Sequence, residues 1–355
     1  MIQPESIRTQ GATWLVYVCL AISFLLLSTP LIAKPSLNVY DHRDEASFHY
    51  ATVQSFTEQL PFVDVSDYRS ATTPLYHLEL AMLAKMGLDL TGLRLVSTLL
   101  SLACLLLVYG ILSSRGDPLK AWLFTGLLLF SPYFLGPAVR LSTDNAALLA
   151  ALLTIYILDT KPISRKYFWI ACLSIFIAVL TRQIYVWMLA SYFAFNLLRT
   201  PESRWEQMLL PMAVPVAGLA YFVWLWQGFT PPSFATKHSN GLNWDAPIFI
   251  VSMVGFYCSV FGLWLVRLSK SKGELMTASL LAILATIGFL LVHPVSNAYP
   301  LDDNSRGGWL WSIAAKLPEV AGSSIVIWGL FPVGCVGLYV IGRYLIARKE
   351  YLISI

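Results

Sequence analysis

The chain has 355 residues, of which 57% are hydrophobic and only 12% are charged. An ordinary soluble domain carries about 25% charged residues, so this composition excludes a soluble enzyme and a disordered chain. The formal net charge of +4 is spread over many short segments and does not form a basic tail, which excludes a nucleic-acid-binding protein. Most of the chain is therefore expected to lie within lipid.

The apolar runs predict ten membrane-spanning helices, with both chain termini in the cytoplasm, because a helix needs about 20 apolar residues to cross a bilayer. The run 167–198 is interrupted by Thr181-Arg182-Gln183, which predicts two short helices that meet at a polar turn. The first span lacks an obvious small-residue cleavage site, so we expect a retained anchor. The predicted spans are 13–32, 92–112, 119–137, 143–158, 167–180, 184–198, 207–227, 245–266, 274–292 and 322–346.

Basic residues set the predicted orientation of these spans. Two spans separate each consecutive pair of basic segments, so all the segments fall on one side, which the positive-inside rule makes cytoplasmic. This orientation requires that residues 74–86 do not cross, and we interpret them as an interfacial or re-entrant helix. The basic segments are 113–120, 159–166, 199–206, 267–273 and the C-terminal tail.

The sequence thus predicts an all-α integral membrane protein with a single polytopic domain over residues 1–355. Its first extracytoplasmic loop, 33–91, is long for a connection, and such loops are usually functional. We expect interfacial helices within it. Residues 229–244 and 294–320 form further extracytoplasmic loops in this prediction.

Ionisable side chains of the predicted outer side suggest a chemistry. Asp44 and Glu45 would lie at a lipid–water boundary, where carboxylates are candidates for a raised pKa and for base catalysis. Arg182 lies between two short apolar helices, a position that costs about 2.5–3.5 kcal/mol and usually faces a cavity or a partner. Arg140 and Asp144 are spaced to pair across one helical turn. A carboxylate with several cations suits transfer from a lipid phosphate, because the carboxylate takes a proton and the cations hold the departing phosphate.

Several short motifs occur in a characteristic order. They are Asp44-Glu45-x-x-Phe48-His49, Thr72-Thr73-Pro74-x-Tyr76, Arg94-Leu95-Val96, Thr143-Asp144 and Arg182-Gln183. Over residues 38–250 this order resembles the GT-C superfamily of membrane glycosyltransferases, and within it the dolichol-phosphate-glucose-dependent α-1,2-glucosyltransferase family. That family has a later Ser-x-His element, and Lys237-His238-Ser239-Asn240 departs from it in order and spacing.

The resemblance implies a GT-C-like fold whose first loop carries the catalytic carboxylate. It implies an inverting transfer of a hexose from a polyprenyl-phosphate sugar, such as a dolichol-phosphate sugar, to a hydroxyl of a lipid-linked glycan or other acceptor. Asp44 then acts as the base, and Glu45 orients it or binds the acceptor. The chain is short for a eukaryotic member, which suggests a bacterial or archaeal cell membrane with the site facing outside, or the ER lumen in a eukaryote.

The candidate site residues fall into three groups. The catalytic candidates are Asp44 and Glu45; the donor-phosphate candidates are Arg182, Gln183, Lys237, His238 and Arg306; and the acceptor or supporting candidates are His49, Asp67, Tyr68, Thr73, Arg140 and Asp144. No cofactor is expected. Some members of the superfamily bind a divalent metal, but the outer loops contain no Asp-x-Asp motif. The expected partners are the donor, the acceptor and membrane lipids, without nucleic acid.

Two other functions remain open from the sequence. A transporter or flippase of a lipid-linked or small polar substrate would show inverted repeats and a polar path at the bilayer midplane, and the sequence has no second copy of its central break. Another extracytoplasmic lipid-phosphate enzyme, such as an oligosaccharide ligase or an acyltransferase, would also use a histidine-bearing first loop.

Overall fold

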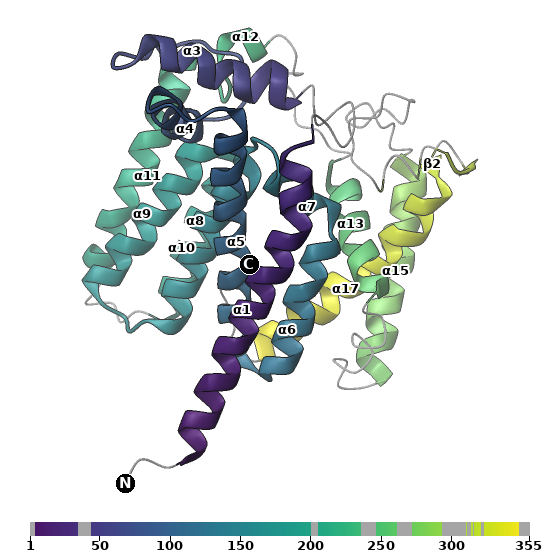
Figure 1. Cartoon of the computed structure of the whole chain (residues 1–355). Helices are drawn as coiled ribbons and strands as arrows, with labels where there is room; N and C mark the ends of the chain where they lie inside the picture. The colour runs from purple at the N-terminus through teal and green to yellow at the C-terminus, as the bar shows by residue number, and fades with distance from the viewer. Residues whose placement is uncertain are drawn as a thin grey trace. The chain divides into compact units, whose positions relative to one another are not determined.

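A computed structural model describes residues 4–34, 44–199, 205–235, 246–260, 272–292, 310, 314, 316–320 and 323–347 (Figure 1). The chain forms two compact units, Met1–Ser239 and Asn240–Ile355. The longer helices of the first unit are α1 (Pro4–Ile32), α5 (Leu90–Arg115), α6 (Pro118–Leu127), α8 (Thr143–Thr160), α9 (Arg165–Thr181), α10 (Trp187–Arg199) and α11 (Trp205–Trp226). Its shorter elements are η1 (Glu45–Tyr50), α3 (Ala51–Gln59), α4 (Leu75–Lys85), η2 (Leu128–Phe130), α7 (Pro132–Ala138), η3 (Gln183–Val186) and α12 (Pro232–Ala235).

The second unit contains three described helices and one small hairpin. The helices are α13 (Ala246–Val260), α15 (Lys272–Val292) and α17 (Ile325–Ala347), and strands β1 (Glu319–Val320) and β2 (Ser323–Ser324) pair antiparallel. Helices α13 and α17 lie very close together at two glycines. A methyl group added at Gly255 would overlap the Leu330 carbonyl, and one at Gly334 would overlap the Val251 carbonyl. Small residues that allow such close backbone approach are typical of helix pairs in membranes.

Four helices of the described residues are long and apolar enough to cross a membrane: Trp14–Ile32, Leu90–Ser114, Trp205–Trp226 and Ile325–Arg343. Large apolar side chains such as Trp14, Leu26 and Trp224 are exposed on them, as expected for surfaces that contact lipid. The chain is accordingly an all-α integral membrane protein. The prediction of ten complete spans is wrong, because the described residues contain four such helices, or five if one bent helix pair is counted as a span.

The missing spans have a simple physical origin. Helices α9 and α10 have only 17 and 13 residues, and the membrane core requires about 20. Helix α8 has 18 residues but carries an aspartate near each end. In α13 and α15 the described apolar stretches, Pro247–Ser259 and Met276–Gly288, are also shorter than a complete span.

The predicted span 119–137 is broken, not continuous. Helices α6 and α7 meet at an angle of 67°, because Ser131 is extended and Pro132 begins the next helix without an N–H to donate. Two carbonyls of α7 receive side-chain donors from neighbouring helices. Thr98 Oγ1 donates to the Ala138 carbonyl at 2.8 Å, and Asn145 Nδ2 donates to the Phe134 carbonyl at 3.0 Å. Such compensation is what a broken helix inside a membrane protein requires.

Two local predictions are confirmed. Helix α9 ends at Thr181, Arg182 is extended, and η3 leads into α10, so the run 167–198 is two short helices with a polar turn between them. Within residues 74–86, Leu75–Lys85 forms α4, whose 11 residues are too short to cross a bilayer at about 1.5 Å per residue. In Figure 1, α3, α4 and α12 lie across one end of the longer helices of the first unit.

Candidate functional site

The short helices η1, α3, α4 and α12 form a helical cap at one end of the first unit. Glu45 connects the beginning of this cap to the membrane helices. Its side chain is 2% exposed and accepts two hydrogen bonds from Arg94, from Nε at 2.8 Å and from Nη2 at 2.5 Å. The backbone N–H of Leu141 donates a third bond at 3.1 Å. Arg94 also donates through Nη1 to the Ile32 carbonyl at the end of α1. Glu45 is therefore a buried anchor that joins η1 to α1, α5 and the segment before α8.

Arg140 lies beside this anchor. Its Nη1 donates to the Lys34 carbonyl at 2.7 Å and is 3.8 Å from Glu45 Oε2. The predicted pairing of Arg140 with Asp144 is wrong. Asp144 pairs with Arg182 instead. The reason is that α8 begins only at Thr143, so Arg140 is not on the same helix as Asp144.

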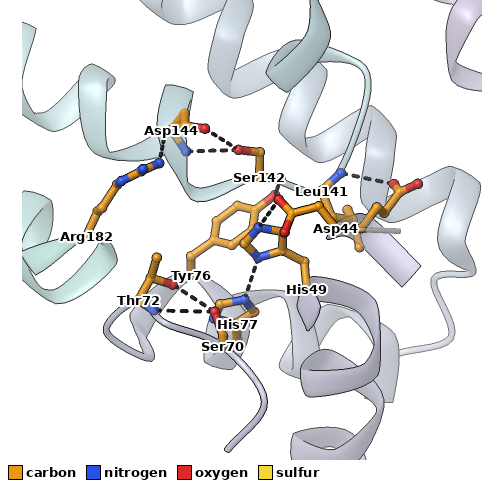
Figure 2. A network of polar contacts seen from close by, with 11 residues as sticks. Asp44, His49, Ser70, Thr72, Tyr76, His77, Leu141, Ser142, Asp144 and Arg182 are labelled. Carbon is orange, nitrogen blue, oxygen red and sulfur yellow. Dashed lines mark hydrogen bonds and ion pairs between the residues drawn. The ribbon is translucent and has the colours of Figure 1, made fainter. Parts of the chain in front are cut away.

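Asp44 is the neighbour of Glu45 but has the opposite environment. Its side chain is 64% exposed, and its Oδ2 lies 3.6 Å from His49 Nε2. Glu45–Tyr50 forms a π-helix, a wider turn that is frequent at functional sites, and the two side chains meet five residues apart along it. His49 Nδ1 lies in turn 2.9 Å from His77 Nε2 on α4. Figure 2 shows this row of three side chains.

A second ion pair lies at the same end of the first unit, where α8 begins and α9 ends. Arg182 contacts Asp144, and their side chains are 30% and 46% exposed. Ser142 caps α8, because its Oγ accepts from Asp144 N–H at 3.2 Å and donates to the Asp144 carboxylate at 2.8 Å. The hydroxyl of Tyr76 accepts from Ser142 N–H at 3.2 Å, which links α4 to this pair (Figure 2).

The electrostatics of Asp44 differ from the prediction. Burial acts to raise the pKa of its carboxyl, but the hydrogen bond to His49 and the electrostatic interactions with His49 and Arg182 lower it by more, so the net pKa lies below the ordinary value. The prediction of a raised pKa is therefore wrong for Asp44. The carboxylate is ionised at neutral pH. Burial, followed by the electrostatic interaction with His49, lowers the pKa of His77 well below its usual range, so His77 is neutral there.

Gln183 holds separate loops together. Its Nε2 donates to the Ala71 and Phe229 carbonyls at 2.6 and 2.8 Å, and its Oε1 accepts from Thr73 N–H at 3.2 Å. Thr73 also donates through Oγ1 to the Val179 carbonyl at 2.6 Å. Both amide hydrogens of Gln183 are thus used on backbone carbonyls, and the structure places Gln183 and Thr73 as fasteners of the first loop.

Asp67 and Tyr68 also connect the first loop to the segment after α11. Asp67 Oδ1 accepts from Ser233 N–H, and the Tyr68 carbonyl accepts from Ser233 Oγ, both at 3.0 Å. The Tyr68 hydroxyl donates to the Thr72 carbonyl. The ring of Tyr68 is buried against Phe56 and Trp226. These contacts shape the wall beside the two histidines.

The predicted site residues therefore separate into three groups. Asp44, His49, Asp144 and Arg182 lie together at one end of the first unit, whereas Glu45, Arg140, Gln183, Thr73, Asp67 and Tyr68 fasten the surrounding loops. Lys237, His238 and Arg306 lie outside the described residues. His77 and Ser142 were not predicted as site residues, and Arg94 and Tyr76 were named only as members of the short sequence motifs. The sequence signal that could have pointed to His77 is its place, with His49, in the predicted first extracytoplasmic loop.

Among the described residues, no group of three His, Cys, Asp or Glu side chains is placed to hold a metal ion. Comparisons with protein-family models, with curated proteins and with solved structures found no match to this chain.

Proposed function

We propose that this protein is an inverting glycosyltransferase that moves a hexose from a polyprenyl-phosphate sugar to a hydroxyl of a lipid-linked glycan or other acceptor. The observation that carries the proposal is the juxtaposition of an exposed, ionised Asp44 with Arg182, whose positive charge acts on that carboxylate. A base beside a fixed cation at one end of a membrane-embedded helix bundle suits a reaction that removes a proton from one substrate and releases a phosphate from the other.

In the proposed reaction, Asp44 takes the proton of the acceptor hydroxyl. The acceptor oxygen attacks the anomeric carbon from the side opposite to the phosphate. The bond between that carbon and the phosphate oxygen breaks, and polyprenyl phosphate leaves with the electron pair, so the anomeric configuration is inverted. Proton, sugar and phosphate are all accounted for without an oxidant or a further reactant.

Arg182 holds the departing phosphate in this proposal. A guanidinium has five N–H donors in a planar fork that matches phosphate oxygens, and the contact with Asp144 involves Nη1. Asp144 therefore orients the guanidinium, and Ser142 orients Asp144. Gln183 contributes to donor binding by fixing the turn that carries Arg182, since its own amide is bonded to backbone carbonyls.

The site is proposed to face the extracytoplasmic side of a bacterial or archaeal membrane, within a GT-C-like fold. This orientation follows from the basic segments 113–120 and 159–166, which join the opposite ends of the helices that carry the site. The substrates follow from the resemblance of the motifs around Asp44 and Thr73 to the glucosyltransferase family.

The test is a transfer assay with the full-length protein in lipid nanodiscs. Radiolabelled polyprenyl-phosphate glucose, mannose and galactose are supplied separately with a membrane lipid extract as the acceptor source. Label is expected to move from one of these donors into a new lipid-linked or glycan product. In Asp44→Asn, turnover should fall by about 10²–10⁴-fold, the usual contribution of a general base.

The matched control is Glu58→Gln, which removes an exposed carboxylate from α3 in the same loop. Glu58→Gln should retain wild-type transfer. The proposal is overturned if no donor releases label to an acceptor, or if Asp44→Asn matches Glu58→Gln at equal protein level and equal thermal stability. Movement of intact labelled donor across the bilayer without transfer would instead favour a flippase.

A further inference from the structure

A buried pair of histidines lies directly behind Asp44. His77 is fully buried and His49 is 6% exposed. Their ring planes are nearly parallel, at 13°, with centroids 5.2 Å apart, and the rings meet edge to edge, because His49 Nδ1 lies 2.9 Å from His77 Nε2. The rings of Phe56, Tyr68 and Tyr76 surround His77. The other ring nitrogen of His77, Nδ1, is buried and has no hydrogen-bond partner among the described residues.

These contacts determine where the protons lie. A neutral imidazole has one N–H donor and one bare acceptor nitrogen, and a carboxylate is only an acceptor. Since His49 Nε2 faces the Asp44 carboxylate, its proton belongs on Nε2, and Nδ1 of His49 is then an acceptor. The bond between the rings consequently requires that His77 Nε2 donates.

The orphan nitrogen supports the same assignment independently. If His77 donates from Nε2, its Nδ1 has no proton, and the aromatic wall around it faces a bare lone pair. In the opposite tautomer, His77 would place an N–H donor in a buried position without an acceptor, which is the more costly defect. That tautomer would also set the bare Nε2 of His49 against the negative Asp44.

We propose that His77 is a positioning residue, which donates from Nε2 to His49 and so directs the Nε2–H of His49 at the Asp44 carboxylate. As a statement about the base of sugar transfer, this inference rests on the proposed function; as a statement about the tautomers of the two rings, it does not. His77 does not touch the reacting atoms. It acts through His49, which holds Asp44 in the orientation and the charge state that a base requires.

Other titratable groups face this row, and they enter the interpretation of a pH profile. The exposed Asp44 lies beside His49, and Arg182 acts on the Asp44 carboxylate. The phenols of Tyr68 and Tyr76 flank His77, and burial raises the pKa of both, so neither ionises near neutral pH. Glu45, on the same π-helix, is held by Arg94.

The direct test is nitrogen-15 NMR of the full-length protein with labelled histidine, in detergent micelles at pH 5–8. The chain has five histidines, and single substitutions assign the two signals. Two-bond proton–nitrogen couplings report which ring nitrogen carries the proton. The expected result is a proton on Nε2 of both His49 and His77, with His77 neutral over the whole range. A proton on Nδ1 of His49 in the wild-type protein overturns the proposal.

Two variants separate donation from packing. In His77→Gln, the side-chain amide can reach the Nε2 position and donate, so the tautomer of His49 should be retained. In His77→Leu, no donor remains, so His49 should become a mixture of tautomers. The matched control is Thr52→Val, which removes a buried polar group elsewhere in the helical cap and should leave His49 unchanged. Equal His49 spectra in His77→Gln and His77→Leu would refute the donor role, and the wild-type measurement stands even if the leucine variant fails to fold.

The transfer assay links the tautomer to catalysis. His77→Leu should lower kcat by about tenfold with little change in KM and shift the acidic limb of the pH profile upward, while His77→Gln should restore both. A purely structural role would lower the amount of active enzyme without moving the pH profile. Correct tautomers without any sugar transfer would reject the proposed function and retain the positioning role, whereas transfer with the opposite tautomer would do the reverse.

Discussion

The buried pair of Glu45 and Arg94 allows a quantitative prediction. Replacing Glu45 by Gln preserves the shape of the side chain but removes its charge. The remaining amide oxygen can still accept from Arg94 Nε and from Leu141 N–H, whereas the new amide NH2 group faces Arg94 Nη2, which is itself a donor. The change therefore leaves a guanidinium that is 6% exposed without its counter-charge.

The expected cost is about 3–5 kcal/mol in the free energy of unfolding, the range observed when one partner of a buried ion pair is removed. Counting bonds leads to a similar figure, because a hydrogen bond to a charged group contributes about 1.5–3 kcal/mol, and at least one such bond is lost while a donor is left facing a donor. The double variant Glu45→Gln with Arg94→Met should recover part of this loss, since it removes the uncompensated charge as well.

The measurement is reversible unfolding of the purified protein in mixed micelles, for the wild type, the two single variants and the double variant. Asp64→Asn is the matched control, because it changes an exposed carboxylate of the same loop. A loss below about 1 kcal/mol in Glu45→Gln would mean that the pair behaves as a surface ion pair. A double variant as unstable as the sum of the single variants would also refute the reasoning.

Other consequences can be measured on the same preparations. Arg182→Ala should lower kcat for sugar transfer by about 10²–10³-fold, as for other groups that stabilise developing charge, while Arg69→Ala, an exposed arginine of the same unit, should be neutral; comparable activity of the two variants would contradict the phosphate-binding role. Because the pKa of His77 is depressed in the folded state, the unfolded chain binds a proton that the folded chain does not, so the free energy of unfolding should fall as pH drops below about 6.5. His77→Gln should flatten that part of the stability profile, and an unchanged slope would show that another group causes it. Gly255→Ala and Gly334→Ala should each separate α13 from α17, because the added methyl overlaps a backbone carbonyl; unaltered thermal stability of both variants would show that the helices are not packed this closely.

Local patterns of the sequence determined a good part of this protein. Composition and the length of apolar runs identified an all-α membrane protein, and the polar residues at Thr181-Arg182-Gln183 predicted the break between α9 and α10. The segment 74–86 was also predicted to form a helix that is not a span, and α4 has only 11 residues. These features depend on a few consecutive residues, whose hydropathy and backbone preferences act locally.

The predicted number of spans was wrong because an apolar segment of sufficient length does not always form one continuous helix. Residues 119–137 are predominantly apolar, yet Ser131 and Pro132 divide them into two helices. Hydropathy averages over a window and cannot register a single residue that removes a backbone donor. The predicted pairing of Arg140 with Asp144 failed for a related reason, since the helix that would align them begins after Arg140.

The roles of the charged residues were decided only by the tertiary structure. Adjacent in sequence, Asp44 and Glu45 look equivalent, but one is exposed beside His49 and the other is buried against Arg94, 49 residues away. His49 meets His77 across 28 residues. Whether a carboxylate becomes an anchor or a base depends on its burial and on the charges around it, and those are supplied by segments that are remote along the chain and become neighbours only when the helices pack.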